Sequence, residues 1–173
     1  MKHYLLTAAI AFAATAGQAQ HAHQSSLPME TGQSQFAAIA EIVILLRDDP
    51  HTDWAQVNIK ALRDHLVDMD NVTTRAAVER QVNGLSVTFV VTGDEVVATS
   101  IGRMVLAHNP MLQQSSGWAV TAEKRANGAA MTLQVKTSAE LEQVLGLGFF
   151  GVMTVGAHHQ QHHMMIAAGQ SPH

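Results

Sequence analysis

The sequence contains no cysteine, and this absence sets the first limits on its chemistry. Without cysteine the chain can form no disulfide framework and no thiolate metal site, and it carries no cysteine for lipid attachment. Any metal ion would have to bind histidine, methionine, carboxylate or backbone groups. Histidine and methionine are plentiful, with 11 His and 9 Met among 173 residues.

Charged residues are also sparse, at 14% of the chain. The formal net charge is -4, and the ten Lys and Arg residues are scattered rather than gathered into a basic stripe. We therefore expect no nucleic-acid partner, because a reader of the phosphate backbone needs a basic surface. The chain also lacks the Gly-x-Ser-x-Gly, phosphate-loop, His-Glu-x-x-His and dinucleotide motifs, so no enzyme class is predicted by a diagnostic spacing.

Long apolar runs are missing too, and the first residues contain only a short one. Lys2 precedes an apolar run from Tyr4 to Ala14, and the small residues Gly17 and Ala19 follow. This pattern predicts a secretory signal peptide over residues 1–19. No later segment supplies about 18 or more uninterrupted apolar residues, so we expect a periplasmic or secreted protein with no membrane insertion after signal removal.

The rest of the chain has the composition of one globular domain, with 47% hydrophobic residues overall. We predict a flexible His-bearing leader over residues 20–33, a single domain with one core over 34–168, and a C-terminal tail over 169–173. Cleavage after Ala19 would leave His21 and His23 close to the amino terminus, where the free amine and backbone nitrogens can coordinate Cu(II). The interpretation that we prefer is a disordered leader.

Two Asn-Gly pairs predict two β-hairpins. Asn83-Gly84 and Asn127-Gly128 are each flanked by alternating apolar and polar residues. Asn-Gly between such runs is a strong hairpin signal, because the tight turn that matches strand twist needs positive φ at both central positions. The predicted strands are about Ala76 to Val82, Leu85 to Thr92, Trp118 to Arg125 and Ala129 to Lys136.

The two hairpins also align with each other at an offset of 44 residues. Thr88 then falls on Thr132, and Val91 falls on Val135. A His and a Met recur upstream of each hairpin, in "HLVDM" and "HNPM". This self-similarity predicts an internal duplication of ββα units.

Helical patterns fill the remaining segments. We predict a first helix from Ser34 to Asp48, and a second that Thr52 caps and that carries Val57, Ala61, His65 and Met69 on one side. The inward positions of the first helix are predicted to be Phe36, Ile39, Ala40, Val43 and Leu46.

Two further helices follow in the prediction. Asp94 caps the third, which the Asn109-Pro110 pair should end or kink, and Ser138 caps the last, which runs to about Ala168. The order α, α, β, β, α, β, β, α predicts an α+β fold, in which a four-stranded antiparallel sheet has helices packed mainly on one face.

The densest chemical feature is "GAHHQQHHMM", from Gly156 to Met165. On a helix, His159 and His162 fall on the apolar arc, with His158 and His163 at its margins. Burial of four imidazoles within two turns would leave many ring nitrogens to satisfy, at about 1 to 3 kcal/mol for each one left unsatisfied. A metal ion or a polar cleft would remove that cost.

Three helices therefore offer imidazole or thioether groups at one-turn spacing, and we predict that they face a common cavity. Imidazole suits several transition metals, whereas thioether favours Cu(I), so the mixture points to copper, with zinc or haem as alternatives. The inner ligands are predicted to be His65, His108, His159 and His162, the soft ligands Met69 and Met104, and the outer or second-site donors His158 and His163.

Other interpretations of these residues stay open. A lone His on an apolar face is commonly a hydrogen-bonded core residue, and Met at helical spacing is commonly packing. The chain could bind haem noncovalently, act as a His-lined metal-dependent enzyme, or respond to pH. The only carboxylates that an enzyme could recruit near the metal are Asp53, Asp64 and Asp68, and we expect the last two to face solvent. His51 is interpreted as a loop residue.

The function that the sequence predicts best is copper sequestration or transfer. The partners would be the metal ion and a protein that donates or accepts it.

Overall fold

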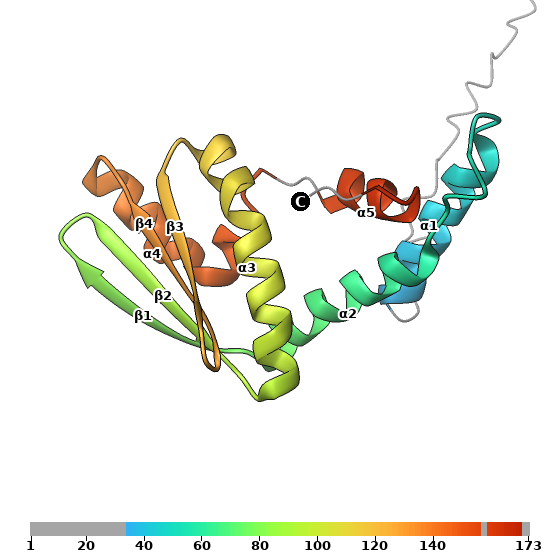
Figure 1. The fold of residues 1–173 in the computed structure, drawn as a ribbon. Coiled ribbons are helices and arrows are strands. Elements are labelled where there is room, and N and C mark those ends of the chain that lie inside the picture. The colour runs from blue at the N-terminus through green and yellow to red at the C-terminus, as the bar shows by residue number, and fades with distance from the viewer. Residues whose placement is uncertain (1–33, 157–158, 171–173) are drawn as a thin grey trace, which may run out of the picture. The chain divides into compact units, whose positions relative to one another are not determined.

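The computed structural model describes residues 34–156 and 159–170, which belong to one unit spanning residues 32–173 (Figure 1). The predicted signal peptide, the predicted leader and residues 171–173 lie outside the described part. The elements in chain order are α1 (Ser34–Asp48), α2 (Ile59–Arg75), β1 (Ala77–Asn83), β2 (Ser86–Thr92), α3 (Glu95–Ser116), β3 (Ala119–Arg125), β4 (Gly128–Gln134), α4 (Ser138–Val152) and α5 (His159–Ala167).

Both predicted hairpins are present, and the α+β class is confirmed. The four strands form one antiparallel sheet in the order β1-β2-β4-β3. The turn chemistry differs from the prediction, because the two-residue turns are Gly84-Leu85 and Ala126-Asn127 rather than the Asn-Gly pairs. Gly84 takes the first turn position with φ 57°, where only glycine is unstrained, and no described non-glycine residue has positive φ.

The central pair of strands brings together the two threonines that the 44-residue offset equates. Thr88 lies directly opposite Thr132 in the ladder between β2 and β4, and their Oγ1 atoms are 2.9 Å apart. This arrangement places equivalent residues at the centre of the sheet. The duplication itself stays a prediction.

One face of the sheet forms the larger hydrophobic core under α3 and α4. Alternation along β2 and β4 directs Val87, Phe89, Val91, Met131 and Leu133 to this face, and all five are almost completely buried. They pack in one cluster with apolar residues of α3 and α4, namely Val97, Ile101, Val105, Leu112, Val144 and Phe149. Helices thus cover the buried face of the sheet, as the alternating strand pattern requires.

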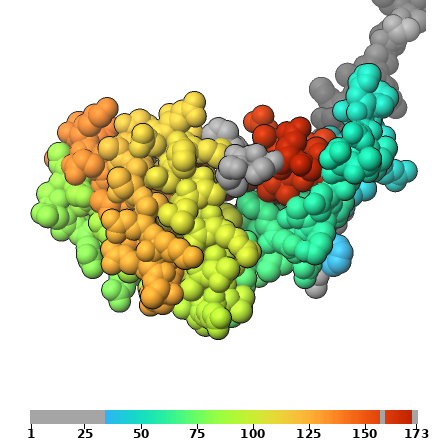
Figure 2. Space-filling view, in the orientation of Figure 1, coloured from blue at the N-terminus to red at the C-terminus, as the bar shows by residue number. Residues whose placement is uncertain are grey.

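A second hydrophobic cluster joins α1, α2 and α5. Its buried members are Ile42 and Leu46 of α1, Leu62 and Leu66 of α2, and Ala167 of α5. Figure 2 shows the surface of α5 beside that of α2, and α5 contacts α1 as well. The prediction of one core is therefore wrong for the described residues, because the last helix packs on α1 and α2 and not on the sheet.

The first two helices differ from the prediction in face and in starting point. Phe36 is 69% exposed, whereas Ile42, which was not predicted inward, is buried with Leu46. Thr52 does not cap a helix, because its hydroxyl donates to the carbonyl of Leu46 at the end of α1. The N-cap of α2 is Asn58, whose side chain accepts from the Ala61 amide.

The later helices show the effects of proline and glycine. Asp94 caps α3 as predicted, but α3 continues past Pro110 to Ser116, where Gly117 ends it with φ 71°. The prediction of a single last helix is wrong, because α4 is kinked at Gly148 and ends at Val152, and α5 begins at His159. The N-cap of α4 is Thr137, in a capping box with Glu140, and not Ser138 as predicted.

Among the described residues, no helix combines the length and apolar character that a membrane crossing requires.

Candidate metal site

Helix α2 carries His65 and Met69 one turn apart. The side chains of Ala61 and His65 line a cavity toward α3 and α5, and the Nε2 atom of His65 is buried. Met69 instead packs with the cluster of α1, α2 and α5. His65 and Met69, which the four-residue spacing predicts on one side of α2, therefore contact different neighbours.

Helix α3 supplies Met104 and His108 to the same cavity. The neighbouring positions Val105 and Leu112 lie in the sheet-side core, and this packing fixes the rotation of α3 about its axis. His108 is only 6% exposed, so its imidazole lies in a mainly apolar setting.

Helix α5 supplies His159 and His162, which are three residues apart and therefore share a face. His162 is 5% exposed. His163 is directed elsewhere, and its Nε2 atom lies 3.5 Å from the Sδ atom of Met69. The predicted ligand His158 lies outside the described residues.

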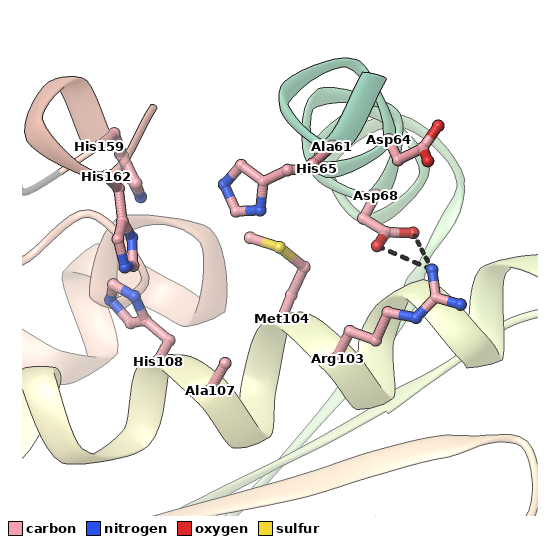
Figure 3. Close-up of a pocket in the computed structure, with 10 residues that line it drawn as sticks. All are labelled: Ala61, Asp64, His65, Asp68, Arg103, Met104, Ala107, His108, His159 and His162. Atoms are coloured by element: carbon pink, nitrogen blue, oxygen red, sulfur yellow. Dashed lines mark hydrogen bonds and ion pairs between the residues drawn. The ribbon is translucent and has the colours of Figure 1, made fainter. Parts of the chain in front are cut away.

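The resulting hollow, which we name the three-helix cavity, has a volume of about 460 Å³. It is lined by Ala61, Asp64, His65, Asp68, Arg103, Met104, Ala107, His108, His159 and His162. In Figure 3, His65 points from α2 toward the histidines of α5, and the Met104 side chain extends toward His65. Five of the eight predicted ligands therefore meet at one place, and Met69 and His163 lie beside it.

The imidazoles around this cavity lie within ring-contact distance of one another. The His65 ring centre is 6.0 Å from that of His162 and 5.6 Å from that of His163, both edge-on. His108 and His159 are stacked, with ring centres 5.9 Å apart. Histidines of α2, α3 and α5 are thus neighbours in space although they are far apart in the sequence.

A polar network, absent from the sequence prediction, borders the cavity and joins α2 to α3. Ser100 donates to Oδ1 of Asp68 at 2.7 Å, and the side-chain amide of Asn71 donates to the Ser100 oxygen at 3.0 Å. Arg103 pairs with Asp68 at 3.1 Å. The expectation that Asp68 faces solvent is wrong, since Asp68 is 9% exposed.

No local pattern in the sequence predicts this network. Asp68 and Asn71 precede Ser100 by about 30 residues, and only the crossing of α2 and α3 brings them together. Asp64, which was also expected to face solvent, is half-exposed. It pairs with Lys60 at 2.6 Å. The hydrogen bond from Lys60 lowers the pKa of the Asp64 carboxyl, so Asp64 stays an anion at the edge of the cavity.

The electrostatic setting of His163 favours a neutral imidazole. Burial lowers the pKa of His163 below its ordinary value, and His159 lowers it further by repulsion, whereas Glu41 of α1 opposes the shift. A neutral imidazole presents a lone pair to a metal ion without first losing a proton.

Within residues 34–156 and 159–170, no three His, Asp or Glu side chains form a group that could hold a metal ion as they stand. His51 lies on the surface loop after α1, where its amide donates to Asp49. His21 and His23 lie outside the described part. The donors that the fold does bring together are imidazoles combined with the thioethers of Met104 and Met69.

Comparison of this chain with protein-family models, with curated proteins and with solved structures finds no match.

Proposed function

We propose that this chain is an exported, periplasmic copper-binding protein that sequesters the ion or passes it to another protein. The observation that carries the proposal is the convergence of His65, Met104, His108, His159 and His162 from three helices on one cavity. Coordination to these side chains would tie α5 to α2 and α3.

The donor types favour copper over zinc. Imidazole binds both ions, but the thioether of Met104 contributes little to zinc and much to Cu(I). Every one of these donors is neutral when it binds, and the carboxylates at the cavity edge are paired with Lys60 and Arg103. An ion of low charge suits such a ligand set better than a hard divalent ion does.

The spacing of the rings supports a site that needs only small side-chain rotations. Two imidazoles on one tetrahedral ion have ring centres about 5 Å apart, because each nitrogen lies about 2.0 Å from the metal. The ring centres of His65 and His162 are 6.0 Å apart, and those of His108 and His159 are 5.9 Å apart. A change of roughly 1 Å is within the reach of rotations about the side-chain bonds.

The position of the cavity supports exchange with a partner. Asp64 and Arg103 at its edge are accessible to solvent, with 41% and 65% of their side chains exposed. A donor or acceptor protein can therefore reach the cavity edge without unfolding the chain.

The test is metal content by mass spectrometry on the untagged full chain purified from the periplasm, followed by copper titration. The variant carries His159→Ala together with His162→Ala, which removes the contribution of α5 to the cavity. His51→Ala is the matched control, because His51 is exposed on a loop. A His21→Ala, His23→Ala variant separates copper bound at the amino terminus.

We expect at least one copper ion per chain in the parent and in both control variants, and in the cavity variant we expect one of the ions to bind at least tenfold more weakly. Absence of copper uptake by the parent would overturn the proposal. Uptake that survives in the cavity variant but disappears in the His21, His23 variant would overturn it as well. Copurified haem, which absorbs strongly in the visible range, would favour the haem alternative.

A further inference from the structure

Met69 of α2 and His163 of α5 form a contact of their own beside the three-helix cavity. The Nε2 atom of His163 is 3.5 Å from the Sδ atom of Met69, and neither residue is among the described residues that line the cavity. These two side chains were predicted as ligands, so their separation from the cavity requires an explanation.

The distance between the two atoms fits two ligands that share one ion. A nitrogen about 2.0 Å and a sulfur about 2.3 Å from a first-row metal ion are about 3.5 Å apart at the tetrahedral angle. The distance between His163 and Met69 has this value. An ion bound by both would therefore leave the separation of the two donor atoms almost unchanged.

His65 is placed to serve as a third ligand. Its ring centre lies 5.6 Å from that of His163, and it precedes Met69 by one turn of α2. Its ring centre also lies 6.0 Å from that of His162, a cavity residue. His65 thus stands between the three-helix cavity and the Met69–His163 pair.

The surroundings of Met69 are mainly apolar, whereas Glu41 of α1 acts on the charge of His163. Met69 packs with Met164, Ile39 and Leu66 in the cluster of α1, α2 and α5. A hard divalent ion would lose its hydration there, whereas soft, neutral donors in an apolar setting suit Cu(I). Met69 also borders a separate hollow of about 260 Å³ beside the start of α1, which Ser34, Gln35, Leu66, Asp70 and Thr73 line as well.

We propose that Met69, His163 and His65 form a second metal subsite that selects Cu(I). The inference rests on the proposed function, because it concerns the same cargo ion. His65 borders both places, but a neutral imidazole binds one ion at a time. With two ions bound, His65 serves the Met69 subsite, and the cavity side chains His108, His159, His162 and Met104 hold the other ion.

The test is an anaerobic Cu(I) titration of the full chain against a chromophoric Cu(I) chelator, for the parent, Met69→Leu and Met165→Leu. Leucine replaces methionine in a core with little loss of packing, so the variants are expected to fold. Met165 is a half-buried methionine of the same helix as His163 and serves as the matched control. Circular dichroism and thermal melting check that the three proteins have the same fold.

We expect two Cu(I) ions per chain in the parent and in Met165→Leu. In Met69→Leu we expect one ion to bind unchanged and the other to bind at least tenfold more weakly, with Cu(II) binding unaffected. Equal stoichiometry and affinity in the parent and Met69→Leu would overturn the second subsite and leave the proposed function intact. Loss of all Cu(I) binding in Met69→Leu would show a single site and would also overturn it. No uptake in any of the proteins would overturn the proposed function itself.

Discussion

At the scale of single residues, the polar groups beside the cavity hold α2 and α3 in a fixed relation. Asp68 accepts from Ser100 and from Arg103, and Asn71 reaches both Ser100 and Arg75. A buried polar network of this kind is stabilising only while each member keeps its partners. The positions of His65 and Met104 depend on it, because each lies on one of the two helices that the network joins.

Replacement of Asp68 by alanine should destabilise the protein. Asp68→Ala removes the acceptor for the Ser100 hydroxyl in a buried setting, and the expected loss is about 1 to 3 kcal/mol of unfolding free energy. Urea unfolding measured by circular dichroism provides the value. Asp70→Ala on the exposed side of the same helix is the control, with an expected change of no more than about 0.5 kcal/mol. Equal effects of the two changes would contradict the structural role of the network.

His163 should make the stability of the metal-free protein depend on pH. Because burial lowers the pKa of His163, the unfolded chain binds more protons than the folded chain as the pH falls below about 6.5. The stability that is present above that pH is therefore lost as the pH falls through the lowered pKa of the folded state.

The measurement is urea unfolding between pH 7.5 and 5, with a chelator present, for the parent, His163→Gln and the exposed-loop variant His51→Gln. We expect the His163→Gln curve to fall less steeply on acidification than that of the parent, and the His51→Gln curve to follow the parent. Parallel curves for the parent and His163→Gln would exclude a buried, neutral His163.

At the scale of elements, the break in the last helical segment decides where the histidines go. Gly148 has φ 60° and ψ -174°, a conformation that is almost restricted to glycine, and it lies within α4. After this kink α4 ends at Val152, and α5 begins as a separate helix at His159. A continuous helix would have held the histidines in line with α4.

This role predicts opposite effects for two neighbouring glycines. Gly148→Ala should destabilise the protein by about 1 to 3 kcal/mol, because alanine is strained in that conformation although no atom obstructs its Cβ. Gly146→Ala, in ordinary helical backbone with open space around it, should stabilise by about 0.5 to 1 kcal/mol. Urea midpoints of the two variants measure the contrast, and a stabilising Gly148→Ala would contradict the kink.

The elements also show which features the sequence predicts and which it does not. Both hairpins, the sheet class and the Asp94 cap follow from local chemistry, namely strand alternation, turn residues and a side chain that accepts backbone hydrogen bonds. The kink at Gly148 does not follow, because an isolated glycine is compatible with a helix as well as with a kink. The burial of Asp68 depends on how two helices cross, and local periodicity does not contain that information.

At the scale of the whole described unit, the three-helix cavity lies where two hydrophobic clusters meet. Helix α2 belongs to both, since Leu62 and Leu66 pack with α1 and α5, and Val72 packs with the sheet-side core. His65 lies between Leu62 and Leu66 on this helix, and Met104 of α3 packs against the sheet-side core. The candidate ligands are therefore held by two separately packed clusters, and an ion bound between them would link the clusters directly.

The convergence of histidines from three helices could be predicted from one-turn spacing, whereas their division into two groups could not. The spacing places His159 and His162 on one face of α5 and His163 beside them. Only the packing of α5 against α2 directs His163 to Met69 and away from the cavity. This division separates the imidazole-rich three-helix cavity from the contact between Met69 and His163.

The most direct test of copper binding in the three-helix cavity is copper K-edge X-ray absorption of a Met69→Leu parent, which keeps only the cavity site, loaded with one Cu(I) per chain and compared with the same protein carrying His159→Ala and His162→Ala. We predict imidazole nitrogens at about 2.0 Å and a sulfur at about 2.3 Å in the parent, with fewer imidazole scatterers in the variant. Identical spectra for the two proteins, or a parent that retains no copper, would contradict the account.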